Sequence, residues 1–238
     1  MKDYFLIIDT ETTQSQLVAD FGATISDRKG NVVAQTGVLM DGIYNNASEH
    51  PLFFTSDSEG IWSRAGQDRR YGAYELMIND GSRMIASVAA VNRWLVKALV
   101  TYNPILTAYN LPFDLDKCNL TGINVTIFER KFCLWAAAYT QFAHTKAYRN
   151  FALQCHAFNP PTNFGNMTYQ TNAEIMTRFV TGNPSLKDEP HTSLEDILEY
   201  EILVLNKILK TRSTKWLLTK PFSYNWRDCQ VRDNFESL

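Results

Sequence analysis

The residues with the clearest chemical potential are acidic side chains that directly follow short apolar stretches. Asp9-Thr10-Glu11-Thr12-Thr13 comes at the end of the apolar run Tyr4–Ile8. Side chains two residues apart in an extended segment point to the same side, so Asp9 and Glu11 can direct two carboxylates at one point. Mg²⁺ or Mn²⁺ would offset the cost of burying them. Taken alone, the pattern is a weak signal, and a solvated strand end with an acidic turn is the simpler interpretation.

A second acidic position follows another apolar stretch, Ile105–Tyr109, in the segment Tyr109-Asn110-Leu111-Pro112-Phe113-Asp114. We expect Phe113 to pack inward and Asp114 to open a helix that runs to Leu120. A carboxylate at a helix start also complements the helix dipole, which requires no chemistry.

The third group is His191-Thr192-Ser193-Leu194-Glu195-Asp196. Thr192 and Glu195 fit a capping box, which places His191 just outside a helix and Asp196 in its first turns. The two side chains can then face one pocket. Since Glu195 has a structural role in the capping box, Asp196 is the better metal candidate. A surface histidine before a capped acidic helix is the alternative.

In this order and spacing, the three groups together resemble the DEDD exonuclease superfamily, in its histidine-bearing branch. That branch includes proofreading subunits of bacterial replicases, oligoribonuclease and ribonuclease T. The resemblance extends from Asp9 to Asp196 but depends on three short segments. Many relatives have Gly in place of Gln14 and His in place of Tyr109. Neither residue is an expected metal ligand, so these departures concern loop shape and contacts with the terminal base.

The resemblance implies an RNase H-like α/β fold, with a five-stranded mixed sheet flanked by helices. It implies two Mg²⁺ or Mn²⁺ ions, with His191 as the general base, a role that suits an imidazole pKa of roughly 6.5. The four implied metal ligands are Asp9, Glu11, Asp114 and Asp196. The implied substrate contacts are Thr10, Thr12, Asn110 and Phe113.

The implied activity is 3′–5′ exonuclease hydrolysis that releases nucleoside 5′-monophosphates. The implied partner is a nucleic-acid 3′ end, with single-stranded DNA favoured over RNA and a role in DNA replication and repair. An exoribonuclease of the same chemistry is the main alternative, since nothing in the motifs reads a 2′-hydroxyl. A silent module that grips 3′ ends or docks to a polymerase or another replication or repair protein is a further alternative. RNase H-like or transposase-like endonuclease chemistry would not require the second and third motifs.

Composition sets broad limits. The 238 residues carry a formal net charge of −2, which by itself gives no sign of a polyanion partner. We expect one domain over residues 1–238, located in the cytoplasm and without a membrane partner, because no signal peptide or bilayer-length apolar run is present. Four cysteines without a CxxC pair predict reduced thiols. A zinc site drawn from Cys133, His144, Cys155 and His156 would match no usual ligand spacing.

The pattern of apolar residues predicts the elements that position these groups. We expect a three-stranded meander formed by Tyr4–Ile8, Leu17–Ser26 and Val32–Met40, and a later strand at Ile105–Tyr109. Gly42–Gly81 is interpreted as connections with a short helix at Tyr71–Ile78. Further helices are predicted at Arg83–Val100, Asp114–Leu120, Leu134–Phe142, Ala173–Val180 and from Thr192 onward.

Two segments are candidates for holding the substrate. Residues 202–238 form a predicted basic and aromatic helix and tail, with no acid between Ile202 and Arg227. Cations and aromatic faces together suit single strands, although helix-end lysines and packed aromatics are common without that role. The tail residues concerned are Lys207, Lys210, Arg212, Lys215, Trp216, Lys220, Phe222, Tyr224, Trp226 and Arg227. The second candidate is a loop with Trp62, Arg64, Arg69, Arg70 and Tyr71.

Overall fold

The chain begins with an antiparallel meander, which confirms the prediction from the apolar pattern. The computed structural model describes residues 2–49, 63–161, 165–220 and 229–231. Strands β1 (Tyr4–Thr12), β2 (Val18–Asp27) and β3 (Val32–Met40) pair in chain order. Gly30 makes the tight turn between β2 and β3 with a left-handed φ of 85°, which glycine adopts without steric cost.

Parallel strands extend the meander on both sides. Strand β5 (Ile105–Ala108) pairs with β1, β6 (Lys131–Cys133) pairs with β5, and β4 (Met84–Ala86) pairs with β3. The described residues therefore form a mixed sheet of six strands in the order β4-β3-β2-β1-β5-β6, one strand more than the five predicted.

Strand β4 lies where a helix was predicted to begin. The helix prediction for Arg83–Val100 is wrong for its first five residues, because α2 spans Val88–Tyr102. Ser87 caps that helix, its Oγ accepting a hydrogen bond from Ala90 N at 3.3 Å. The three residues of β4 are extended and pair with the end of β3.

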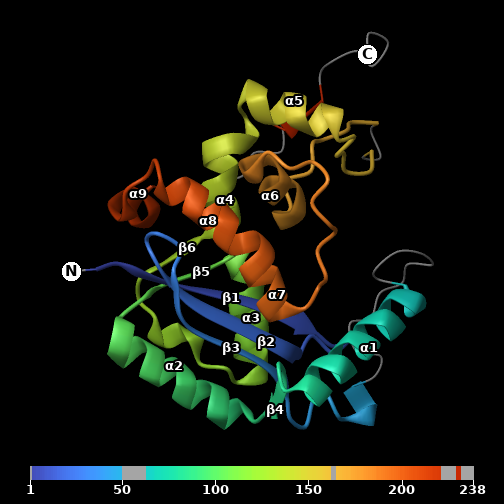
Figure 1. Cartoon of the computed structure of the whole chain (residues 1–238), viewed down its shortest axis with the longest axis vertical. Helices are drawn as coiled ribbons and strands as arrows, with labels where there is room; N and C mark the ends of the chain where they lie inside the picture. Colours follow the sequence, from blue (N-terminus) through green and yellow to red (C-terminus); the bar gives the residue numbers. More distant parts are fainter. Residues whose placement is uncertain (1, 50–62, 162–164, 221–228, 232–238) are drawn as a thin grey trace.

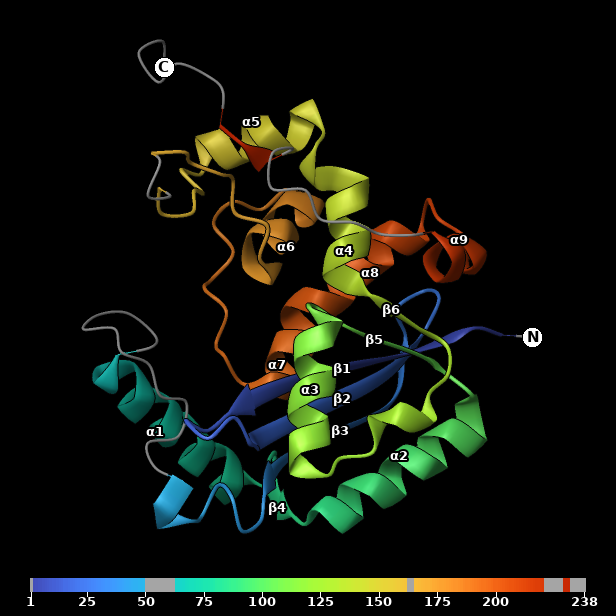
Figure 2. The same ribbon diagram turned by 180° about the vertical axis from the view of Figure 1, so that it is seen from behind.

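Helices cover both faces of the sheet (Figures 1 and 2). Helices α2 and α3 (Leu111–Thr121) lie on one face, where the even-numbered residues Leu6 and Ile8 of β1 are buried. The other face buries Phe5 and Ile7. It is covered by α4 (Leu134–Ala138), α6 (Ala173–Thr181), α7 (Ser193–Asp196) and α8 (Ile202–Leu209). The α/β class and the flanking helices are thus confirmed.

The connection between β3 and α2 contains more helix than predicted. Helix α1 spans Arg64–Asp80, from the N-cap Ser63 to the left-handed Gly81, whereas only Tyr71–Ile78 was predicted. Its apolar residues do not gather on one face, so periodicity could not reveal its length. A 3₁₀ turn, η1 (Ala47–Glu49), lies earlier in this connection, and residues 50–62 fall outside the described ranges.

Most of the remaining predicted helices are present. The α6 prediction is confirmed, whereas α3 begins at Leu111, three residues before its predicted start at Asp114. The predicted helix Leu134–Phe142 is α4 followed by a π-turn, η3 (Tyr139–Ala143). The helix predicted from Thr192 consists of α7, a second π-turn, η4 (Ile197–Glu201), and α8. Elements that were not predicted are η2 (Val125–Ile127), α5 (Lys146–Gln154) and α9 (Thr214–Thr219). In the ranges that the structure describes, no helix combines the length and apolar character needed to cross a bilayer.

Candidate active site

The carboxyl-terminal half of β1 supplies two of the predicted acids. Residues 9 and 11 of the strand share one face, as predicted, and Asp9 pairs in the ladder with Gly22 and Glu11 with Asp20. The register shifts after Glu11, at the end of the paired segment. The intervening Thr10 faces the opposite side, where its Oγ1 donates a hydrogen bond of 2.9 Å to Asp114 Oδ1.

Helix α3 supplies the third acid. Asn110 precedes it in the left-handed conformation, with a φ of 82°, and Pro112 occupies its first turn. Asp114 is only 2% exposed. Phe113 does not pack inward as predicted: it is 40% exposed and Leu111 is the buried apolar residue. Residues two apart in a helix point to different faces, so only one of Leu111 and Phe113 can pack against the core. That residue is Leu111.

Helix α7 carries the fourth acid, Asp196, which is 3% exposed. The predicted capping box is wrong. The Thr192 hydroxyl has no hydrogen-bond partner among the described residues, and Glu195 Oε2 lies 2.5 Å from Arg83 Nη2. The backbone N–H of Ser193 donates instead to Asp20 Oδ2 at 2.9 Å. A carboxylate from β2 therefore caps the helix, and the buried Arg83 attracts the glutamate that the capping box required.

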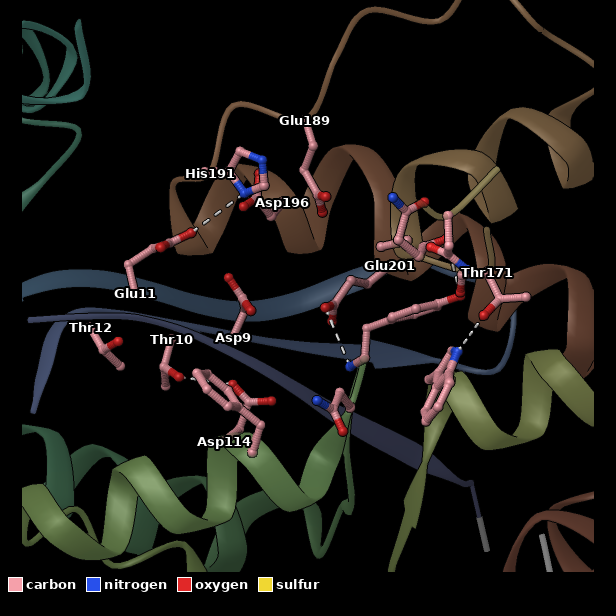
Figure 3. Close-up of a pocket in the computed structure, with 17 residues that line it drawn as sticks. Asp9, Thr10, Glu11, Thr12, Asp114, Thr171, Glu189, His191, Asp196 and Glu201 are labelled. Carbon is pink, nitrogen blue, oxygen red and sulfur yellow. Dashed lines mark hydrogen bonds and ion pairs between the residues drawn. The ribbon is translucent and has the colours of Figure 1, made fainter. Parts of the chain in front are cut away.

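All nine predicted site residues line one cavity of about 600 Å³ (Figure 3). They come from β1, from the start of α3 and from the region around α7, which are far apart in the sequence. The lining includes the expected acids and histidine, Asp9, Glu11, Asp114, His191 and Asp196, and the expected substrate contacts, Thr10, Thr12, Asn110 and Phe113.

Three of these side chains form a compact group. Ligand atoms of Glu11, His191 and Asp196 all lie within 4.8 Å of one another, and His191 Nδ1 is 4.0 Å from Glu11 Oε1. Asp9 and Asp114 line the same cavity outside that group. The backbone of His191 is left-handed, with a φ of 56°, a conformation that non-glycine residues adopt at some cost.

The acids of the cavity are hard to ionise without a cation. Burial and the nearby Asp20 raise the pKa of Asp9 to about 7. Burial, followed by the charge of Asp9, raises the pKa of Glu11, Asp114 and Asp196 well above the ordinary range. These shifts have one cause: the site gathers several carboxyl groups away from water, where their charged forms are disfavoured.

The chemistry of the donor set fits a hard divalent cation. Asp9 Oδ2 and Asp196 Oδ1 are buried oxygens with no hydrogen-bond partner within the described ranges. A buried carboxylate oxygen requires a hydrogen-bond donor or a cation, and Mg²⁺ and Mn²⁺ favour oxygen ligands. Asp9, Glu11, Asp114 and Asp196 are therefore suitable ligands.

His191 is suited to accept a proton. Burial, and secondarily the charge of Arg70, lowers the pKa of the His191 imidazole to about 4. The imidazole is then neutral at neutral pH, which is the form of a general base.

Arg70 is a cation in contact with this group, although it was predicted to lie in a substrate-binding loop. Its Nη1 lies 3.7 Å from Glu11 Oε2, and its side chain is 2% exposed. The loop predicted to hold Arg70 is the beginning of α1 from Arg64 onward, while Trp62 lies outside the described residues. Arg70 therefore belongs to the acidic site and does not form part of an exposed phosphate-binding loop.

Two further acids line the cavity and were not predicted. Glu189 precedes His191 by two residues, and burial together with the charge of Asp9 raises its pKa to about 8. Glu201 follows Asp196 by five residues and is 2% exposed. A glutamate at position 201 interrupts the apolar stripe of that helix, which was an available signal. Nothing in the sequence distinguishes Glu189 from an ordinary loop residue.

A buried polar network supports the site from behind. Asp20, which is fully buried, accepts hydrogen bonds at Oδ2 from Tyr74 OH at 2.8 Å, Ser193 N at 2.9 Å and Arg83 Nη2 at 3.3 Å. The network joins β2, α1 and the first residue of α7, so it positions the helix that carries Asp196.

Residues 209–214 of the basic C-terminal segment lie at the other end of β1. Thr214 Oγ1, at the start of α9, donates to Asp3 Oδ2 at 2.6 Å, and Arg28 Nη2 donates to Leu209 O at 2.8 Å. The Arg212 guanidinium lies over the Trp216 ring, 4.8 Å from its centroid. These residues are thus remote from the cavity at the carboxyl end of β1. The predicted contacts from Phe222, Tyr224, Trp226 and Arg227 lie outside the described residues.

The cysteines bear out the expectation of thiols. All four are free. Across the part of the chain that the structure describes, Cys133, His144, Cys155 and His156 do not gather into a ligand cluster, so the alternative zinc site is not formed.

Comparison of the chain with protein-family models, with curated proteins and with solved structures found no match.

Proposed function

We propose that this protein is a metal-dependent 3′–5′ exonuclease with an RNase H-like fold. One observation carries the proposal: four carboxylates from β1, α3 and α7, three of them buried and Asp9 partly buried, line a single cavity together with His191. The fold assignment is supported by a mixed sheet that begins with an antiparallel meander and continues into parallel strands, with helices on both faces.

The residues of the chain divide the work of hydrolysis between them. Asp9, Glu11, Asp114 and Asp196 would hold the cations, which when bound would activate water and stabilise the leaving oxygen. The His191 imidazole takes a proton from the attacking water. The water oxygen bonds to phosphorus, the bond from phosphorus to the 3′ oxygen breaks, and a nucleoside 5′-monophosphate leaves. The shortened strand keeps a 3′-hydroxyl.

The cavity favours a chain end over the middle of a duplex. Its volume of about 600 Å³ is in the range of pockets for small ligands. Phe113 presents a half-exposed ring at its wall, and Thr10, Thr12 and Asn110 offer polar groups to the terminal nucleotide. We propose single-stranded DNA ends as the preferred substrate and make RNA an outcome of the test.

The test uses 5′-labelled single-stranded DNA, duplex DNA and RNA, each with Mg²⁺, Mn²⁺ or a chelator. We expect products that shorten stepwise from the 3′ end with metal and no hydrolysis with chelator. Internal cuts, or equal activity in chelator, would reject the mechanism. Stepwise shortening of RNA alone would assign the exoribonuclease. A folded, metal-loaded protein that cuts no substrate would favour the silent module.

Matched variants assign the roles. Asp114→Asn should abolish hydrolysis, whereas Asp116→Asn on the same helix should not, because its carboxylate is 59% exposed and pairs with Lys117. His191→Asn should lower the rate by about 10²–10⁴ through loss of the base. Asparagine is chosen because it tolerates a left-handed backbone.

A further inference from the structure

Glu201 has a buried carboxylate oxygen that nothing in the described structure satisfies. Its Oε1 accepts a hydrogen bond from Tyr109 N at 3.3 Å, while its Oε2 is buried without a partner among the described residues. Figure 3 shows the side chain directed into the cavity beside Asp9. A buried carboxylate oxygen left in this state is costly unless a ligand of the site completes it.

The helix is built so that Glu201 faces the cavity. Five residues of α-helix would turn Glu201 about 140° away from Asp196. The π-turn η4 intervenes, and the N–H of Ile202 donates to Ile197 O across five residues. Thr177 Oγ1, which is buried, donates to Tyr200 O at 3.1 Å and so stabilises the turn. The wider turn brings both carboxylates to the same cavity.

The electrostatic surroundings of Glu201 are acidic. Asp9, Asp114, Glu189 and Asp196 are acids whose charges act on it. Arg70 contacts Glu11. Asp9 also has a buried oxygen, Oδ2, without a hydrogen-bond partner in the described ranges. Two unsatisfied carboxylate oxygens therefore face the same cavity from β1 and η4, and within the described ranges neither side chain forms an ion pair with a cation of the protein.

We infer that Glu201 binds a divalent cation, Mg²⁺ or Mn²⁺, together with Asp9 on the side of the cavity where Asp114 lies. The inference deepens the proposed function, because it extends the cation-binding set beyond the four predicted carboxylates. Because Glu201 and Asp9 both belong to the protein, we expect this cation to bind in the absence of substrate.

Titration of the metal-free full chain with Mn²⁺, followed by calorimetry and by the electron paramagnetic resonance of free Mn²⁺, tests this directly. Glu201→Gln should bind at least one Mn²⁺ about 10- to 100-fold more weakly, a loss of the size found even for groups that support metal ligands. The control is Glu199→Gln in the same π-turn. Glu199 Oε2 lies 2.6 Å from Lys187 Nζ and does not line the cavity, so the control should bind Mn²⁺ like the parent.

Thermal unfolding separates cation binding from a structural role. In chelator, Glu201→Gln should melt close to the temperature of the parent, because no cation is bound and the glutamine amide oxygen can still accept the hydrogen bond from Tyr109 N. With Mn²⁺ its melting temperature should rise less than that of the parent, since binding to the native state raises stability. A variant that melts lower in chelator and gains as much from Mn²⁺ as the parent would show a structural role and overturn the inference.

The inference and the proposed function can fail separately. If the parent binds Mn²⁺ but hydrolyses no nucleic acid, the exonuclease proposal fails, and the comparison of Glu201→Gln with the parent still decides the role of Glu201. Equal Mn²⁺ affinity and stoichiometry in both proteins would overturn the inference even in an active enzyme. A parent that binds no Mn²⁺ would overturn both.

Discussion

Arg83 is the residue whose removal should most reveal how the site is supported. Its side chain is fully buried, and Nη2 lies 3.3 Å from Asp20 Oδ2 and 2.5 Å from Glu195 Oε2. Replacement by methionine keeps the approximate length of the side chain and removes its charge. Asp20 would then be a buried carboxylate held only by Tyr74 OH and Ser193 N.

The size of the effect follows from that geometry. Breaking a buried ion pair from one side costs about 3–5 kcal/mol, because the remaining charge is buried without a counter-charge. At about 2–4 °C per kcal/mol for a chain of this size, the melting temperature should fall by roughly 6–20 °C. The double variant Asp20→Asn/Arg83→Met removes both charges and should regain much of this loss. The losses in unfolding free energy of the two single variants, added together, should therefore exceed the loss in the double variant.

Urea unfolding followed by tryptophan fluorescence measures these free energies. Arg93→Met is the matched control, because Arg93 is exposed on α2, and it should stay within about 0.5 kcal/mol of the parent. A cost below about 1 kcal/mol for Arg83→Met would show that the ion pair does not support the site. So would a double variant whose cost equals the sum of the two single costs, since Asp20 and Arg83 would then be independent.

Two further predictions concern packing and ionisation. A Cβ at Gly22 would lie 2.6 Å from the backbone at the start of α7, so Gly22→Ala should cost about 1–3 kcal/mol and slow hydrolysis by displacing that helix. Gly72→Ala, which meets nothing within 4 Å on α1, should be neutral or stabilising in the same urea assay; equal losses would contradict the packing argument. Stability of the metal-free protein should fall from pH 5 to pH 8, because raised carboxyl pKa values, about 7 for Asp9 and about 8 for Glu189, favour folding only while these groups hold protons. The lowered pKa of His191, about 4, makes stability rise with pH below pH 6.5, but this is the effect of one group against several carboxyl groups. Melting curves in chelator check this, Mn²⁺ should flatten the decline, and a stability that rises over this range would contradict it.

The sequence predicted the parts of the site that depend on local pattern. The exit of an apolar strand indicated Asp9 and Glu11, and alternation along a strand indicated their shared face. The apolar stretches Tyr4–Ile8, Leu17–Ser26 and Val32–Met40 predicted the meander. These features depend on residues that are close in the chain, so sequence spacing reports them directly.

The unpredicted parts depend on contacts between distant segments. Asp20 gave no sign that it would cap α7, because its partner Ser193 is 173 residues away. The capping box failed for the same reason: Arg83 offered Glu195 a buried charge, which local spacing cannot anticipate. The contact of Arg70 with Glu11 was not predicted, because Arg70 lies in the part of α1 that precedes the predicted helix Tyr71–Ile78.

The π-turn η4 lets the two halves of one continuous helical segment, α7 and α8, pack against different neighbours. Ahead of it, the position of Asp196 is dictated by the sheet, through the contact of α7 with β2. Beyond it, Leu205 and Ile208 follow the packing of the core against α4 and α6. A wide turn amounts to a single inserted residue, so it absorbs the mismatch in phase between the two halves. The orientation of Glu201 can therefore vary through evolution of the core while Asp196 stays in place, and a one-residue deletion here should force the two halves to compete.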